Sequence, residues 1–260
     1  MDDSLSSLAV SIAVGAVGGY LGSLMISKRM ALAGDALGHV ALPGLGLGLA
    51  FHFDPSLGAF LFVLLGILLV WQLGGKTSLG METLIGIAFV TSLAIGFLIV
   101  PEPELLESLI GDVSKVSPPA AVFSILISLG VFLLVRSIYP GMMLLNISED
   151  LAHVQGITGR KYNLLYLLAI AAVVSLGVKV TGTLLVGALM IIPAAASRNV
   201  SRNLRQYAYG SLFIGASSCA IGLSVHRQTG FPAGPSMILV NAFLFGLSLL
   251  LKKTIARAGA

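Results

Sequence analysis

Charged side chains are scarce in this sequence. They make up 10% of the 260 residues, whereas soluble globular domains contain about 25%. Hydrophobic residues account for 57%, and the mean hydropathy is +1.00. This composition excludes water as the main solvent of the chain and indicates a protein that lies largely within a lipid bilayer.

Cysteine is nearly absent, and so is a basic leader. The single cysteine, Cys219, lies in an apolar run and is expected to pack there, which excludes a disulfide framework or a multi-cysteine metal cluster within the chain. Removable signal peptides begin with a basic region, but Asp2 and Asp3 precede the first apolar stretch here. We therefore expect the first apolar stretch to be retained as a span.

Motifs of common enzymes are also lacking. Gly75, Lys76 and Thr77 resemble the end of a phosphate-binding loop, but Val70 occupies the position of a required glycine. Neither the zinc-protease motif H-E-x-x-H nor the hydrolase motif G-x-S-x-G occurs in the sequence. We therefore expect no ATP binding through this motif and no enzymatic activity.

Long apolar runs are what the sequence does contain. A membrane-spanning helix needs about 20 apolar residues, and nine runs reach or approach that length. Their centres lie near Gly15, Gly44, Leu64, Leu93, Ile127, Ile170, Leu189, Gly215 and Phe245. The expected fold is an all-α polytopic membrane protein with eight or nine transmembrane helices, in a single domain over residues 1–260. The 31 glycines indicate close packing between these helices.

The cations between the runs predict the orientation of the chain. One side collects Lys28, Arg29, Lys76, Arg136, Arg160, Lys161, Arg198, Arg202, Arg205, Lys252, Lys253 and Arg257, against Lys115, Lys179 and Arg227 on the other. The positive-inside rule assigns the first set to the cytoplasm, which leaves the N-terminus outside and the C-terminus inside. Because the cations follow the spans, the pI near 9.3 indicates lipid as the surrounding partner and no nucleic acid.

Two ionisable residues lie inside an apolar run. Asp35 and His39 are four residues apart, so a helix places them on one face. Ionisable groups within a membrane usually face a transport path or a partner. A carboxylate with an imidazole suits zinc, manganese or iron, whereas magnesium and calcium favour oxygen alone. A proton relay, and a structural pairing with each other or with hydroxyl groups on neighbouring helices, are the alternatives.

Prolines and polar residues near the span ends supply further expectations. Pro43 is expected to disrupt the helix bond to the carbonyl of His39, and Pro193 to kink its span. His52, Asp54 and His226 lie near outer span ends, where they are weaker candidates for receiving a metal or are simply solvated.

The polar interruption from Tyr139 to Tyr162 is expected on the cytoplasmic side. Ser148 is followed there by Glu149 and Asp150, a pattern that favours a helix N-terminus through capping and the helix dipole. A short cytoplasmic helix is therefore predicted.

Several blocks of sequence together resemble one family. They are R29-M-A-L-A-G-D-A-L-G-H-V-A-L-P-G44, E82-T-L-I-G-I, L109-I-G-D-V, S148-E-D-L-A-H-V-Q-G156, G182-T-L-L-V-G-A-L-M-I-I-P-A-A-A-S-R198 and P232-A-G-P-S-M236. In this order they resemble the zinc and manganese (ABC-3 type) permease family of ABC metal importers, over nearly the whole chain. One position departs from the pattern, since Gly38 precedes His39 where many relatives carry serine.

The resemblance implies a mechanism and partners. It implies an ABC importer permease fold, a homodimer of this chain, separate cytoplasmic ATPase subunits, and an extracytoplasmic protein that delivers the metal. It further implies that Asp35 and His39 lie on the metal path. The cytoplasmic coupling segment would lie at about residues 142–160, and its coupling residues would be Glu149, Asp150, Leu151, Ala152 and Gly156.

The sequence thus predicts a permease that imports zinc or manganese, with iron as a further candidate, by alternating access driven by a separate ATPase. The ion would be cargo, and no stably bound cofactor is expected. A proton-coupled secondary metal transporter is the main alternative, followed by a passive channel and a purely structural membrane subunit.

Overall fold

The computed structural model describes residues 3–100, 109–111, 117–183 and 185–258, all of whose regular elements are helices. They are α1 (Asp3–Ser27), α2 (Ala33–Val40), α3 (Leu42–Ala50), α4 (Pro55–Gly74), α5 (Met81–Ile99), α7 (Pro118–Ile147), α8 (Glu149–Val154), α9 (Gly159–Thr181), α10 (Val186–Val200), α11 (Leu204–Thr229) and α12 (Ala233–Ala258). Helices suit lipid because every backbone polar group is bonded within its own segment. The expected all-α fold is confirmed.

Seven of the described helices are long and apolar enough to cross a bilayer, namely α1, α4, α5, α7, α9, α11 and α12. The two other predicted spans are shorter than expected. The run around Gly44 is divided at Ala41 into α2 and α3, two residues before Pro43, where the prolyl nitrogen has no proton to donate to the helix. The run around Leu189 becomes α10, a helix of 15 residues that continues through Pro193 to Val200.

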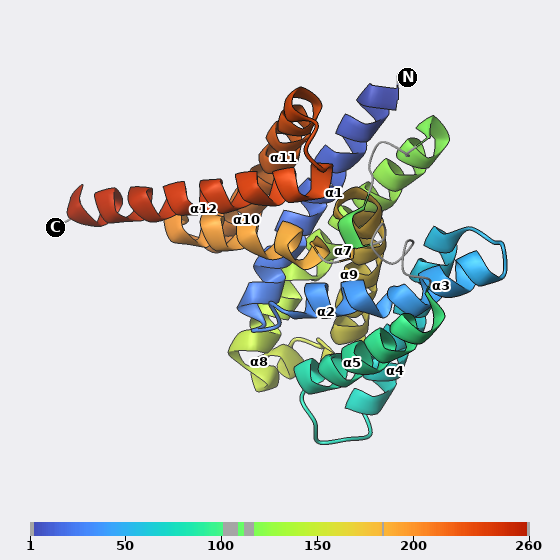
Figure 1. Ribbon diagram of the computed structural model, residues 1–260. Coiled ribbons are helices and arrows are strands. Elements are labelled where there is room, and N and C mark those ends of the chain that lie inside the picture. The colour runs from blue at the N-terminus through green and yellow to red at the C-terminus, as the bar shows by residue number, and fades with distance from the viewer. Residues whose placement is uncertain (1–2, 101–108, 112–116, 184, 259–260) are drawn as a thin grey trace.

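Helix α1 forms the centre of the molecule. Figure 1 shows it passing through the middle of the bundle, where it contacts α7, α9, α10 and α11. In an 18-residue stretch of α1, 72% is buried, against 22% in α5 at the periphery. Aromatic contacts hold this centre together, since the Tyr20 ring lies 5.1 Å from that of Phe132 and 5.5 Å from that of Tyr139.

Glycines allow the helices around α1 to approach its backbone. A Cβ atom added to Gly19 would lie 2.2 Å from the carbonyl oxygen of Ser211 in α11, and one added to Gly22 would lie 2.0 Å from that of Met190 in α10. No larger side chain fits at such separations without displacing a backbone. The glycines were predicted to mark helix packing, and at these positions they do.

One end of the bundle gathers the ends of α1, α4 and α9 beside α8 (Figure 1). Lys28, directly after α1, donates a hydrogen bond from Nζ to Oδ1 of Asn163 in α9 at 2.6 Å. The Arg160 guanidinium lies 4.6 Å from the centre of the Trp71 ring in α4. Lys28 and Arg160, both predicted to be cytoplasmic, therefore share one end of the molecule.

Two further cations from the predicted loops complete the comparison. Arg136 is an exposed residue within α7, which continues to Ile147, and its predicted cytoplasmic side stays a prediction. Lys115 lies outside the described residues.

Candidate metal path

Asp35 and His39 both lie on α2, the short helix before the break at Ala41. Helix α10 holds α2 in place at two glycines. A Cβ atom added to Gly187 would lie 2.6 Å from the Cβ of Asp35, and one added to Gly38 would lie 2.7 Å from the carbonyl oxygen of Thr183. The segment that carries the candidate ligands is therefore fixed against the start of α10.

The position of Gly38 has a direct structural reason. A side chain there would also approach Cγ1 of Val186 to 2.6 Å. A serine at this position would not fit without a shift of α2 or α10, since real Cβ atoms do not come so close to a backbone oxygen or a methyl group. The glycine thus permits a close approach between α2 and Thr183.

His39 is 8% exposed and packs on an aromatic ring of α5. Its ring centroid lies 5.4 Å from that of Phe89. Its Nδ1 atom is buried without a hydrogen-bond partner. A buried polar atom without a partner costs about 1–3 kcal/mol, so a purely structural histidine is expected to be bonded. The pairing of Nδ1 with Asp35 or with a neighbouring hydroxyl, expected if the pair only joins helices, is not formed.

Thr183 adds a second unpaired polar atom at the contact between α2 and α10. Its Oγ1 atom is buried and has no hydrogen-bond partner, while its carbonyl oxygen faces Gly38. Neither Thr183 nor Phe89 was identified from the sequence as part of the site. In the sequence, the only feature that pointed to Thr183 was its position in the family-like block that begins at Gly182.

The described residues contain no group of three or more histidine, cysteine, aspartate or glutamate side chains that could hold a metal. Asp35 and His39 therefore form a pair in this conformation, with no third such ligand beside them in the described part of the chain. A pair suits passage of an ion better than permanent retention, because stable sites for these metals usually have four or more ligands.

The weaker candidates have local structural roles. Asp54 caps α4, since its Oδ1 atom accepts hydrogen bonds from the amide N–H groups of Ser56 at 2.7 Å and Leu57 at 3.3 Å. Partial burial alone would raise the pKa of Asp54, but these amide bonds and the nearby Lys179 ammonium lower it overall. The structure gives Asp54 a capping role that needs no metal.

The two histidines among the weaker candidates lie in or next to turns, where His52 is exposed and His226 partly exposed. His52 has a positive φ of 56° in the turn between α3 and α4. His226, in the last turn of α11, forms a hydrogen bond between Nδ1 and the carbonyl oxygen of Phe231. The structure does not bring His52, Asp54 and His226 together into a three-ligand group.

Helix α8 confirms the predicted short helix in the polar interruption. Its N-cap is Ser148, whose Oγ atom accepts from the amide of Leu151 at 3.3 Å. Its end is closed by two bonds, from the amide of Ile157 to the carbonyl of Ala152 and from that of Gly156 to His153, both at 2.9 Å. Gly156 has a φ of 74°, which glycine adopts without strain.

The residues predicted to couple the chain to an ATPase differ in burial on α8. Ala152 is fully buried and anchors the helix, whereas Glu149, Asp150 and Leu151 are exposed. The apolar side chain of Val154 is also 86% exposed. This helix presents both acidic and apolar groups on the outside of the molecule.

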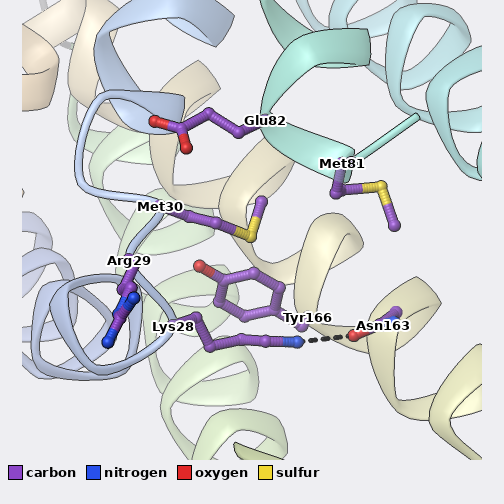
Figure 2. Close-up of a pocket in the computed structure, with 8 residues that line it drawn as sticks. Lys28, Arg29, Met30, Met81, Glu82, Asn163 and Tyr166 are labelled. Carbon is purple, nitrogen blue, oxygen red and sulfur yellow. Dashed lines mark hydrogen bonds between the residues drawn. The ribbon is translucent and has the colours of Figure 1, made fainter.

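A cavity that the sequence did not indicate lies near α8. It has a volume of about 240 Å³ and lies between the end of α1, the start of α5 and the start of α9. Figure 2 shows Lys28 reaching along it to Asn163, with Glu82 on the opposite wall. The Lys28 ammonium also lies 5.3 Å from the centre of the Tyr166 ring. Burial lowers the pKa of Lys28 to about 8, although the Glu149 carboxylate opposes this shift.

The fold and site define a multi-pass membrane permease, with several long apolar helices around α1 and an ionisable pair on an interrupted helix. Residues 3–252 match the model of the ABC 3 transport family, and the chain belongs to this family. It is therefore a permease of the type found in ABC metal import systems and not an ATPase, as the sequence predicted.

Individual relatives cover almost the whole chain. The manganese import system permease protein ScaB of Streptococcus gordonii is 27% identical over 250 residues, 95% of this chain and 90% of ScaB. The high-affinity zinc uptake system membrane protein ZnuB of Haemophilus influenzae is 28% identical over 252 residues, 94% of this chain and 95% of ZnuB. The structure of PsaBC from Streptococcus pneumoniae in complex with Fab matches with a TM-score of 0.82 and 26% identity, over 95% of this chain and 91% of that chain.

Proposed function

We propose that this chain forms the membrane path of an importer for manganese or zinc, and that Asp35 and His39 bind the ion in transit. The observation that carries the proposal is the buried, unpaired Nδ1 atom of His39, one helical turn from Asp35 on an interrupted helix. An imidazole nitrogen and a carboxylate oxygen are suitable ligands for either ion. An ion bound between them would supply the missing partner of Nδ1.

Relatives named for manganese and relatives named for zinc are both similar to this chain. ScaB is named for manganese import and ZnuB for zinc uptake, at nearly the same identity to this chain. Iron remains a further candidate, since another relative from H. influenzae is named for iron transport. The donor pair suits all three ions, so uptake has to be measured for each of them.

The proposal includes partners. Membership of the ABC 3 transport family supports a separate cytoplasmic ATPase, an extracytoplasmic metal-binding protein and a second copy of this chain. The exposed side chains of Glu149, Asp150 and Leu151 on α8 would dock against the ATPase. Movement of α8 on ATP binding would then shift the helices between outward-facing and inward-facing states, each favoured by a different nucleotide state.

The test is elemental analysis of metal accumulated by metal-starved cells that express the chain with its ATPase. We expect Asp35→Asn and His39→Ala each to reduce uptake of one ion by about 10- to 100-fold, the range typical for disturbed metal ligation. Ser217→Ala, on the exposed face of α11, serves as the control at matched membrane abundance. Unchanged uptake of every metal would assign the pair to helix packing and move the path to His52, Asp54 and His226.

The energy source separates this proposal from a proton-coupled transporter. Uptake by the importer requires an ATPase that hydrolyses ATP, so an ATPase variant without hydrolysis should abolish it. Uptake that persists with such a variant and disappears when the proton gradient is collapsed would instead establish the secondary transporter.

A further inference from the structure

Lys28 occupies the joint between α1 and the segment that carries the candidate metal ligands. Helix α1 ends at Ser27, and α2 begins at Ala33, with Asp35 in its first turn. The Lys28 side chain is held from the α9 side, by Oδ1 of Asn163 at 2.6 Å and by the face of the Tyr166 ring. Any force on Lys28 therefore acts close to the start of α2.

The acidic group that influences Lys28 comes from α8. Glu149, the first residue of this helix, interacts electrostatically with Lys28. It lines a second cavity, of about 360 Å³, which shares Met81 and Asn163 with the cavity beside Lys28. The two cavities thus border the same two side chains, and open space extends from α8 toward the joint. No ion pair between Lys28 and Glu149 is formed within 4.0 Å in the described part of the chain.

The joint itself is strained. Arg29 follows Lys28 with a φ of 59°, a left-handed conformation that is unfavourable for a residue other than glycine. The turn is closed by the amide of Met30, which donates to the carbonyl of Met25 at 2.9 Å, and by that of Arg29, which donates to Ile26 at 3.1 Å. Strained backbone of this kind is common where a segment changes conformation.

We propose that Lys28 is a positioning residue that transmits movement of α8 to α2, by exchanging its hydrogen bond with Asn163 for an ion pair with Glu149. A carboxylate is a stronger acceptor for an ammonium group than a neutral amide oxygen, so a shift of α8 toward Lys28 favours the exchange. The ammonium would then follow α8 and move the strained joint at Arg29. This inference rests on the proposed function, because it assumes that an ATPase moves α8.

The test is the number of metal ions imported per ATP hydrolysed by the complete importer in proteoliposomes, with radioactive manganese and zinc as probes. Lys28→Glu and Glu149→Lys should each lower this ratio by about tenfold, within the range of typical coupling between sites, while ATP hydrolysis persists. The double variant Lys28→Glu/Glu149→Lys should recover the ratio to within about twofold of the wild type. A merely structural role would not produce this recovery.

The reversal Lys161→Glu, at an exposed cation in the first turn of α9, serves as the control for a change of net charge at the same end of the molecule. If Lys28→Glu does not reach the membrane, Lys28→Gln replaces it, because glutamine keeps a donor for Asn163 but cannot form the ion pair. Two results would overturn the role of Lys28 but leave the proposed function intact. One is a wild-type number of ions imported per ATP in the single variants. The other is no recovery of this number in the double variant at equal abundance. Absence of ATP-driven import by the wild type overturns the proposed function and the inference together.

Discussion

The Lys28 ammonium lies between the amide oxygen of Asn163 and the Tyr166 ring, where burial lowers its pKa from 10.5 to about 8. The unfolded chain therefore binds more protons than the folded chain between these two pH values, and stability rises with pH across this window. Below pH 8 both states are protonated, and the cost of burying the charge is fully present.

We accordingly expect the thermal stability of the purified chain in detergent to increase between about pH 8 and pH 10.5. The contribution of Lys28 should be about 1–2 kcal/mol, reduced from the full value because the ammonium is partly solvated. Lys28→Gln should remove this contribution. The difference in thermal stability between the wild type and the variant should therefore become smaller as the pH rises. A difference that is constant across the window would contradict the assigned environment.

Sequence reasoning identified Asp35 and His39 because ionisable residues stand out in an apolar run. It did not identify Lys28, because a cation directly after a span is the ordinary pattern of the positive-inside rule. Phe89 and Thr183 were missed for another reason. Aromatic and hydroxyl side chains are common in membrane helices, and only the packing of α5 and α10 against α2 shows that these two lie at the site.

At the scale of elements, the sequence predicted α8 and the disruption of the helix near Pro43. Both depend on local chemistry, a serine N-cap in one case and a missing amide proton in the other. Span lengths were less predictable, because hydropathy does not separate a helix that crosses the bilayer from a shorter buried helix such as α10. The mutual arrangement of the helices was not predictable, since it depends on contacts between residues far apart in the chain.

The contact between α1 and α11 permits a direct test of helix packing. Gly19→Ala places a Cβ atom 2.2 Å from the carbonyl oxygen of Ser211, and overpacking of this kind typically costs about 1–3 kcal/mol. We expect a lower melting temperature and less protein in the membrane. Gly130→Ala in α7 is the matched control, because nothing lies within 4 Å of the added methyl group. It should be neutral or slightly stabilising, since alanine favours helices.

At the scale of the whole molecule, the orientation in the membrane is still a prediction. Cys219 is fully buried, so single cysteines can be added to the natural sequence and labelled selectively. Thr229→Cys, exposed at the end of α11, should react with a membrane-impermeant maleimide on intact cells. Thr77→Cys, exposed between α4 and α5, should react only after permeabilisation. The opposite pattern would mean that the N-terminus lies in the cytoplasm.

The central position of α1 also bears on how the protein is made. Helix α1 is synthesised before α10 and α11, yet the surfaces that cover Gly19 and Gly22 belong to α11 and α10. Until those helices have been synthesised, the glycine face of α1 is open to lipid, where small residues favour association with other helices. Helices made later thus complete the environment of a helix made earlier. If translation stops before α11, the truncated chain keeps the glycine face of α1 exposed and prone to association with other helices. Cellular quality control would have to recognise and remove such a product.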